Sequence, residues 1–124
     1  MKIYISHKKD SNFENELYEP LRNSELVKKH NFIFPHEDIA VTFNVKEMLQ
    51  NKECDLVIAE VSYPATGQGI ELAWANMFDI PVVCIYKEGV EISGSLSFIT
   101  NKFLMYTSKE NMLEDIEGAI KLYE

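Results

Sequence analysis

The sequence predicts a single α/β domain over residues 1–124, in which helices cover both faces of a doubly wound, five-stranded parallel sheet. Short apolar segments rich in β-formers alternate along the chain with segments of helical periodicity, and this alternation is typical of a parallel sheet with right-handed crossovers. The third strand-like segment, 55–61, is apolar without strict alternation, as in a strand that is covered on both faces. We expect a flavodoxin-like or Rossmann-like three-layer sandwich with the strand order 2-1-3-4-5.

The five predicted strands share a short length and an apolar, β-rich composition. They are 2–6, 31–35, 55–61, 80–86 and 102–107. Between the last two, residues 87–101 are predicted as a loop with a short helix.

The first predicted helix opens at Ser11, because Ser11 and Glu14 have the spacing of a capping box. Its apolar residues share one face: Phe13, Leu17 and Leu21. Pro20 must bend or restart this helix, because proline has no backbone N–H group and its ring clashes with the preceding turn.

Three further helices are predicted over 44–54, 67–78 and 108–124. Asn44 and Glu47 again have capping-box spacing. The apolar residues at helical spacing in the second of these helices are Ile70, Trp74 and Met77. Those expected to face inward from the closing helix are Met112, Ile116 and Ile120.

Composition restricts the partners of this domain. The net charge of −8 makes nucleic-acid binding through a basic patch unexpected. No apolar run approaches the roughly 20 residues that cross a bilayer, and the N-terminal residues lack the pattern of a signal peptide, so we expect a cytoplasmic protein without membrane contact. Cys54 and Cys84 are expected to be reduced core residues. The three histidines form no ligand group with them, so no metal or cofactor is expected.

Polar residues follow the predicted strands at the sheet edge where ligands bind in this fold class. They come from four loops: Ser6 and His7, Phe34 to Glu37, Ser62 to Gly69, and Lys87 with Glu88. Gly67 and Gly69 form neither a dinucleotide fingerprint nor a P-loop, because they follow the third strand without a further glycine or a lysine. They can let the backbone approach a ligand closely, or they can be plain turn residues.

Glu71 is expected in the first turn of the helix that follows this loop. The helix dipole would favour its ionised form there. An ionised carboxylate at a substrate crevice is a candidate nucleophile or charge stabiliser. Acids are also common in first helical turns for the dipole alone, so the residues by themselves leave both interpretations open.

The stretch from Asp55 to Tyr86, with DLVIAEVSYPATGQGIELAWA and then IPVVCIY, resembles the nucleoside 2-deoxyribosyltransferases and the related 2′-deoxynucleoside 5′-phosphate N-hydrolases. Members of this family carry an apolar strand that runs into A-E-V, a loop with proline, G-x-G-x-E-L-G, and a strand similar to PVVCIY. The resemblance implies cleavage of the N-glycosidic bond of a 2′-deoxynucleoside or its 5′-monophosphate, with deoxyribose passed to another base or to water. It also implies a homodimer or a higher homo-oligomer.

The resemblance assigns three catalytic residues, Glu71, Glu47 and Tyr4. Glu71 matches the glutamate that attacks the anomeric carbon, and Glu47 matches an acid, usually aspartate, that lies 24 positions earlier. Tyr4 matches a first-strand tyrosine that lies near the nucleophile and could orient it. Alternatively, Glu47 is only the capping partner of Asn44, and Tyr4 is a strand aromatic that packs under a helix.

The residues expected to contact substrate lie in the four loops and in the segment SGSLSFITN. They are Ser6, His7, Phe34, His36, Ser62, Pro64, Gly67, Gly69, Ser95 and Ser97. Ser95, and next Ser97, is the best match to a family segment that reaches into the neighbouring site of a dimer; a turn or N-cap serine is the alternative. Glu60 is interpreted as a structural residue or as a support for the residues that contact substrate. Asp55 is interpreted as a cap or turn acid away from the crevice.

Three departures from the family pattern motivate other hypotheses. SHKKDS replaces a glycine-rich loop after the first strand, so that Lys8, Lys9 or His7 would have to meet a phosphate. Ala65 stands where relatives carry a serine or an acid, and Ala73 replaces the glycine after E-L. A second hypothesis is therefore a catalytically weakened nucleotide- or nucleoside-binding or sensing module. A third follows from IYISHKKD, which resembles the opening of TIR domains, some of which cleave NAD with a glutamate.

Overall fold

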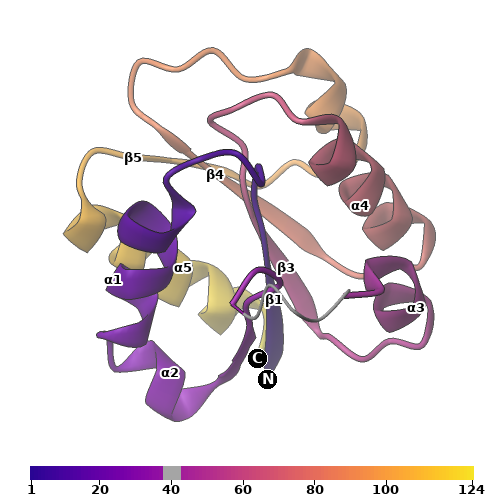
Figure 1. The fold of residues 1–124 in the computed structure, drawn as a ribbon, viewed down its shortest axis with the longest axis horizontal. Helices are drawn as coiled ribbons and strands as arrows, with labels where there is room; N and C mark the ends of the chain where they lie inside the picture. Colours follow the sequence, from indigo (N-terminus) through magenta and orange to yellow (C-terminus); the bar gives the residue numbers. More distant parts are fainter. Residues whose placement is uncertain (38–42) are drawn as a thin grey trace.

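The computed structural model describes residues 1–37 and 43–124, which form a three-layer α/β sandwich (Figure 1). Its sheet has five parallel strands in the predicted order β2-β1-β3-β4-β5. The strands are β1 (Lys2–Ser6), β2 (Asn31–Ile33), β3 (Leu56–Glu60), β4 (Val82–Lys87) and β5 (Phe103–Tyr106). The chain runs outward from β1 to β2 and then returns to β3, so the strand order reverses between β1 and β3.

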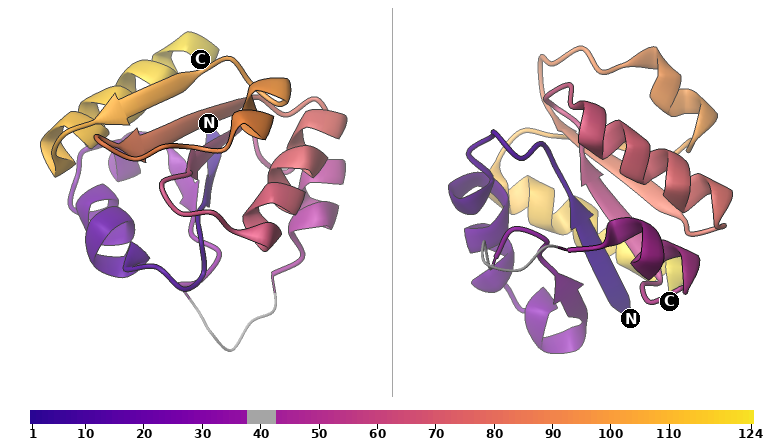
Figure 2. Two further views of the ribbon diagram at one scale, coloured as in Figure 1. Left: turned by 90° about the horizontal axis from the view of Figure 1, so that it is seen from above. Right: turned by 45° about the vertical axis from the view of Figure 1, so that its right-hand side comes forward.

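Helices cover both faces of the sheet (Figure 2). On one face lie α1 (Glu19–Arg22), α2 (Leu26–Lys29) and α5 (Lys109–Tyr123), and on the other lie α3 (Val45–Gln50) and α4 (Thr66–Met77). Each face encloses its own apolar cluster: Leu17, Leu21 and Ile116 belong to the first, and Leu49 and Leu72 to the second. None of the helices in the described ranges is long and apolar enough to cross a membrane.

The first helical segment differs from the prediction at its start. It opens as a π-helix over Glu14–Tyr18 and continues as α1 from Glu19. Ser11 is not its cap, because the Ser11 hydroxyl donates to the Lys8 carbonyl oxygen at 2.7 Å. Pro20 is the second residue of α1 and directly follows the π-helical segment. Tyr18 and Glu19 keep right-handed helical dihedral angles, so the helix continues through Pro20 and does not restart there.

Two other helix starts follow the predicted chemistry. The Asn44 side chain accepts the Glu47 N–H at 3.0 Å and donates to Glu47 Oε2 at 3.2 Å, so the predicted capping box is formed. Ser108 caps α5 by accepting the Asn111 N–H at 3.0 Å. The predicted inward residues of α5, Met112, Ile116 and Ile120, are buried. The loop between β4 and β5 contains the expected short helix, the 3₁₀-helix η2 (Gly94–Phe98).

The face of α4 that packs on the sheet differs from the predicted face. Its buried residues are Gln68, Leu72 and Ala75. Ile70 and Met77 are 46% and 70% exposed. The third predicted residue, Trp74, is half-buried and packs against the apolar cluster that contains Leu72 and Ala75.

Cys54 and Cys84 are free thiols in the core, as predicted. Burial raises the pKa of Cys54 to about 11 and that of Cys84 to about 12. Both therefore remain protonated at neutral pH and behave as small apolar residues.

Candidate active site

A cleft of about 510 Å³ opens beyond the carboxyl ends of β1 and β3, where the strand order reverses. Its walls come from the loop after β1, the loop after β2, and the segment that leads into α4. Four of the predicted substrate-binding residues line it: His7, His36, Pro64 and Gly67. Glu71 lines it as well, so the cleft unites the predicted nucleophile with part of the predicted binding loops.

Two hydroxyl groups hold the Glu71 carboxylate, one on each oxygen. The Tyr4 hydroxyl donates to Oε1 at 3.3 Å, and the Ser6 hydroxyl donates to Oε2 at 3.1 Å. Tyr4 and Ser6 are two residues apart on β1, so their side chains leave the same face of the sheet, the face under α4. Both are buried in the centre of the fold. The carboxylate is therefore positioned by two buried side chains of an inner strand of the sheet.

Glu71 is the sixth residue of α4 and lies in its second turn, not in the first turn as predicted. Burial raises the pKa of Glu71, and the hydrogen bonds from Ser6 and Tyr4 lower it in part. The expectation that the helix dipole favours ionised Glu71 was thus wrong in direction. The effect of the dipole fades beyond the first turn, whereas burial removes water from the carboxylate and penalises its charge. Burial also raises the pKa of Tyr4 far above its usual value, so Tyr4 stays protonated and acts as a donor.

His7 is an uncharged wall of the cleft. Its Nδ1 lies 2.9 Å from the Lys8 carbonyl oxygen, which can only accept, so Nδ1 carries the proton. Its Nε2 then accepts the Tyr18 hydroxyl at 2.6 Å. Burial lowers the pKa of His7 to about 4. Among the residues considered for a phosphate, Lys8 and Lys9 therefore supply positive charge at the cleft and His7 does not.

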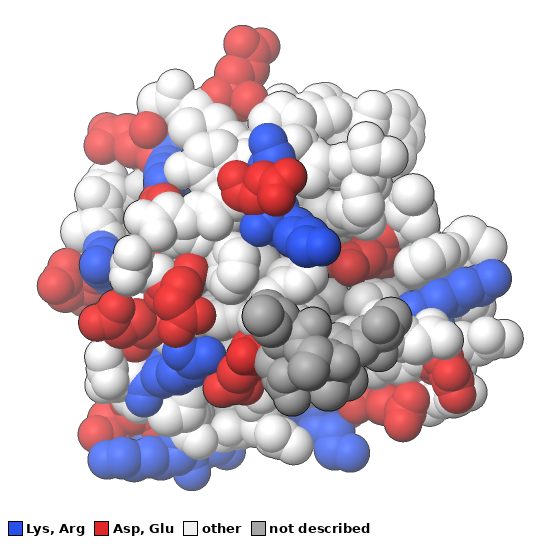
Figure 3. Space-filling model, in the orientation of Figure 1, with Lys and Arg blue, Asp and Glu red and all other residues white. Residues whose placement is uncertain are grey.

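The surface around the cleft has mixed charge. Figure 3 shows lysine and arginine side chains interspersed with acidic ones, without one continuous basic patch on that face. Asp10 also lines the cleft, beside Lys8 and Lys9. A ligand with a single anionic group suits this arrangement better than a polyanion does.

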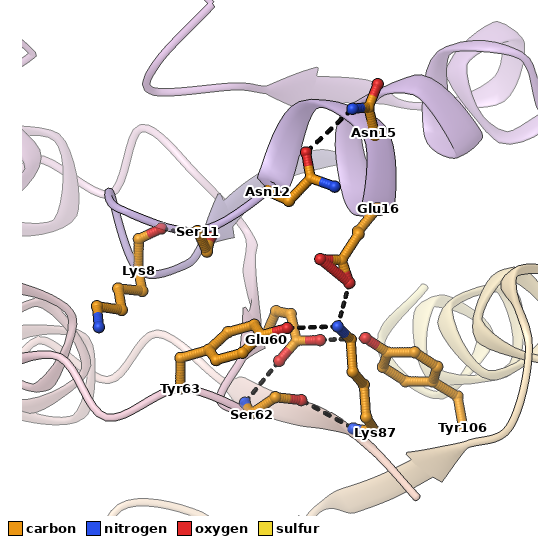
Figure 4. Close-up of polar contacts among 10 residues, drawn as sticks. All are labelled: Lys8, Ser11, Asn12, Asn15, Glu16, Glu60, Ser62, Tyr63, Lys87 and Tyr106. Carbon is orange, nitrogen blue, oxygen red and sulfur yellow. Dashed lines mark hydrogen bonds and ion pairs between the residues drawn. The ribbon is translucent and has the colours of Figure 1, made fainter.

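A buried polar network supports the segment that leads from β3 to α4 (Figure 4). Glu60 Oε1 accepts the Ser62 N–H at 2.6 Å, and Oε2 accepts the Tyr106 hydroxyl. The Ser62 hydroxyl accepts the Lys87 N–H at 2.8 Å, and the Lys87 ammonium contacts Tyr63 and Glu16. Glu60 thus connects the ends of β3 and β5, and both the N–H and the hydroxyl of Ser62 already have hydrogen-bond partners within the protein.

Glu47 lies away from this cleft. It is exposed on α3, engaged in the capping box, and lines a separate hollow with Lys2 and Asn31 at the amino ends of β1 and β2. Asp55 is at that end too, where it accepts the Lys2 N–H at 2.7 Å.

Several predicted substrate-binding residues also lie outside the cleft. Phe34 packs against Tyr18, with ring centroids 4.7 Å apart. Ser95 and Gly69 line a second hollow between α4 and η2, and Ser97 is exposed and donates to the Gly94 carbonyl oxygen.

Sequence reasoning missed three residues that line the cleft, Asp10, Thr66 and Gln68. Their only signal was their position in segments 7–10 and 64–71, which flank the predicted sites. Gly67 and Gly69 face open space, since no atom lies within 4 Å of a Cβ placed on either. The protein's own packing therefore does not demand glycine there, and the room beside Gly67 belongs to the cleft.

Comparison with known proteins gives a partial match in sequence and a match of the fold. No family model matches the chain. Over 40 residues, 32% of the chain, it is 45% identical to a Syntrophotalea carbinolica protein named as a 2′-deoxynucleoside 5′-phosphate N-hydrolase. The matched stretch spans 28% of that relative. The resemblance predicted from the sequence is therefore confirmed over this stretch.

Two solved structures share the fold of the whole domain. One is the CMP N-glycosidase BcmB of Clostridium botulinum, with a TM-score of 0.65, 17% identity, and coverage of 94% of this chain and 99% of that one. The other is a conserved protein of Enterococcus faecalis V583, with a TM-score of 0.63, 20% identity, and coverage of 96% and 98%. At these identities the likeness establishes the fold class, as predicted, and nothing finer.

Proposed function

We propose that this chain is an N-glycosidase of the nucleoside 2-deoxyribosyltransferase type, which cleaves the base from a 2′-deoxynucleoside or its 5′-monophosphate with Glu71 as the nucleophile. One observation carries the proposal: a half-buried carboxylate stands in a cleft at the switch point of the sheet, with a hydroxyl donor on each oxygen. The partial sequence match to a protein named as an N-hydrolase supports the same reaction.

The site suits a double displacement. As the C1′–N bond breaks, its electron pair goes to the base, and positive charge develops on the sugar. A Glu71 oxygen then bonds to C1′, giving a glycosyl-enzyme. Water next attacks C1′, its proton leaves to solvent, and the Glu71 carboxylate is released. The two displacements together retain the configuration at C1′.

Tyr4 and Ser6 have a positioning role in this scheme. Their hydroxyl groups fix the carboxylate plane while each oxygen keeps a lone pair for further bonding. Burial raises the pKa of Glu71, which makes its ionised form a stronger nucleophile, and the hydrogen bonds from Tyr4 and Ser6 favour that ionised form.

We take water as the acceptor and a 5′-monophosphate as the preferred substrate form. Lys8 and Lys9 line the cleft and can pair with a phosphate as point charges. The relative named as an N-hydrolase and the fold neighbour named as an N-glycosidase favour hydrolysis over transfer. Transfer of deoxyribose to a second base remains an expectation from the family resemblance.

The test is base release, followed by chromatography. The protein is incubated with each deoxynucleoside, each deoxynucleoside 5′-monophosphate, CMP and NAD, with and without a second free base. We expect free base from at least one nucleotide, and a loss of several orders of magnitude in Glu71→Gln. Glu110→Gln, at an exposed position on α5, is the matched control. A Glu71→Gln protein that turns over like the parent would remove Glu71 from the mechanism.

A binding or sensing module is the second candidate, favoured by the position of Glu47. The acid expected to assist Glu71 lies at the opposite end of the strands, in a different hollow. Nucleotide binding without release of base from any substrate would support this module. Consumption of NAD alone would support the TIR-like alternative.

A further inference from the structure

Gln68 is a buried polar side chain beside the proposed nucleophile. It is 6% exposed, although it lies between two glycines in the first turn of α4. Gln68 and Glu71 are three residues apart, so they share a face of the helix, with Cβ atoms about 5–6 Å apart. Both line the cleft, and Gln68 also lines the second hollow, of about 380 Å³, which lies between α4 and η2.

The orientation of the Gln68 amide is set by its partner. Nε2 donates to the Glu60 carbonyl oxygen at 2.8 Å. A carbonyl can only accept, so the opposite orientation would place two oxygens against each other. The Glu60 carbonyl faces β1, because the N–H of the next residue, Val61, donates to Ile85 on the opposite side. Strand β1 ends at Ser6, which pairs with Ala59, so the paired part of β1 stops before Glu60 and leaves this carbonyl to Gln68. Gln68 Oε1 is therefore the polar atom that this side chain presents to the cavities.

Within residues 1–37 and 43–124, Gln68 Oε1 accepts no hydrogen bond. It also does not belong to the fully buried side-chain atoms that lack a hydrogen-bond partner. It is thus an oriented acceptor that remains open to a ligand. Lys8 and Lys9 give the cleft a cationic wall, whereas Gln68 gives it a wall that attracts N–H donors and repels phosphate oxygens. This polarity assigns the phosphate to the lysine side and the base to the Gln68 side.

We propose that Gln68 determines base specificity at this site, with Oε1 accepting an N–H from the exocyclic amino group of the leaving base. The proposal rests on the function proposed above. A base with an amino group, such as cytosine or adenine, gains a hydrogen bond. Its keto counterpart, uracil or hypoxanthine, places a carbonyl oxygen against the amide oxygen and leaves both acceptors unpaired.

The test compares substrates that differ only in that group. We expect kcat/KM for dCMP to exceed that for dUMP by about tenfold or more, and dAMP to exceed dIMP likewise. Gln68→Met keeps the length of the side chain and removes the acceptor, so both ratios should fall to about one. A merely structural role would lower the rate on both members of a pair equally and leave the ratios intact. Gln50→Met, at an exposed position on α3, is the control and should keep the parent ratios.

Binding gives an independent measurement when catalysis is removed. In Glu71→Gln, calorimetric dissociation constants for dCMP and dUMP should differ by a similar factor, and the added Gln68→Met substitution should abolish the difference. Equal affinities or equal kcat/KM values within each pair in the parent overturn the assignment of Gln68. They do so even where base is released, so this failure is distinct from the failure of the proposed reaction. A parent that releases no base but binds dCMP more tightly than dUMP overturns the reaction and retains the role of Gln68.

Discussion

Removing the Tyr4 hydroxyl should move the pH dependence of the reaction in a defined direction. Tyr4→Phe keeps the buried ring and deletes the donor that reaches Glu71 Oε1 at 3.3 Å. Hydrogen bonds to charged groups contribute about 1.5–3 kcal/mol. Because this hydrogen bond is long and Glu71 is half-exposed, we expect its contribution to lie at the lower end of that range, about 1.5 kcal/mol. Since 1.36 kcal/mol corresponds to one pH unit, the ionised carboxylate should form about one pH unit higher in the variant.

The direction of the shift in the pH profile follows from the protonation state in which Glu71 reacts. In the proposed mechanism Glu71 attacks as a carboxylate, so activity should fall as the pH decreases through the pKa of Glu71. A further rise of that pKa should then move the acid limb of the pH profile to higher pH. The assay is kcat/KM against pH from about 4 to 9 for the parent, Tyr4→Phe and Ser6→Ala, with Tyr123→Phe on α5 as a control tyrosine. Both site variants should shift the acid limb upward. A uniform loss of rate with an unmoved limb would refute the role of these hydroxyls in holding the ionised carboxylate.

Two other predictions concern stability and Glu47. Burial raises the pKa of Glu71 in the folded state, so its ionisation opposes folding; the cost is absent below the unfolded pKa and develops as pH rises through the folded pKa. Glu71→Gln should therefore be more stable than the parent to urea at pH 7–8. The difference should shrink as the pH falls through the folded pKa and vanish below the unfolded value of about 4.5, and an equal difference at all pH values would contradict this cause. Glu47→Ala should lower Tm by about 2 °C, because it removes one half of the capping box, and should leave kcat/KM within about twofold of the parent. A large loss of kcat/KM at unchanged Tm would restore the catalytic role that the family resemblance assigns to Glu47.

The fold was predictable because its signals are local. Five apolar segments separated by helical periodicity allow few arrangements once parallel crossovers are right-handed, and the strand order followed. The details that failed depend on packing. Ser11 has capping spacing, but its hydroxyl turns back to Lys8 and the helix starts as a π-helix. In α4 both faces carry apolar residues, and only contact with the sheet selects Leu72 over Ile70.

The site was predictable in part, for a related reason. The resemblance marked Glu71 and Tyr4, and the period of two along β1 places Ser6 beside Tyr4. Glu47 was assigned by a spacing of 24 residues, which says nothing of the direction in which α3 presents it. Gln68 lay within the predicted crevice loop but was not singled out, because its burial follows from its hydrogen bond to the Glu60 carbonyl oxygen at the end of β3. A polar group whose role depends on which backbone carbonyl the sheet leaves free has no pattern in the sequence that marks it.

The environment of Glu71 suits a charge that appears only during reaction. No lysine, arginine or histidine within the described ranges forms an ion pair with Glu71, and its partners are two neutral hydroxyl groups. A resident cation would lower its pKa, stabilise the free carboxylate and weaken the nucleophile. Hydroxyl donors hold the geometry and leave the carboxylate without a counter-charge. In the proposed reaction the positive sugar of the transition state would supply that charge, so the attraction would lower the barrier and would not stabilise the free enzyme.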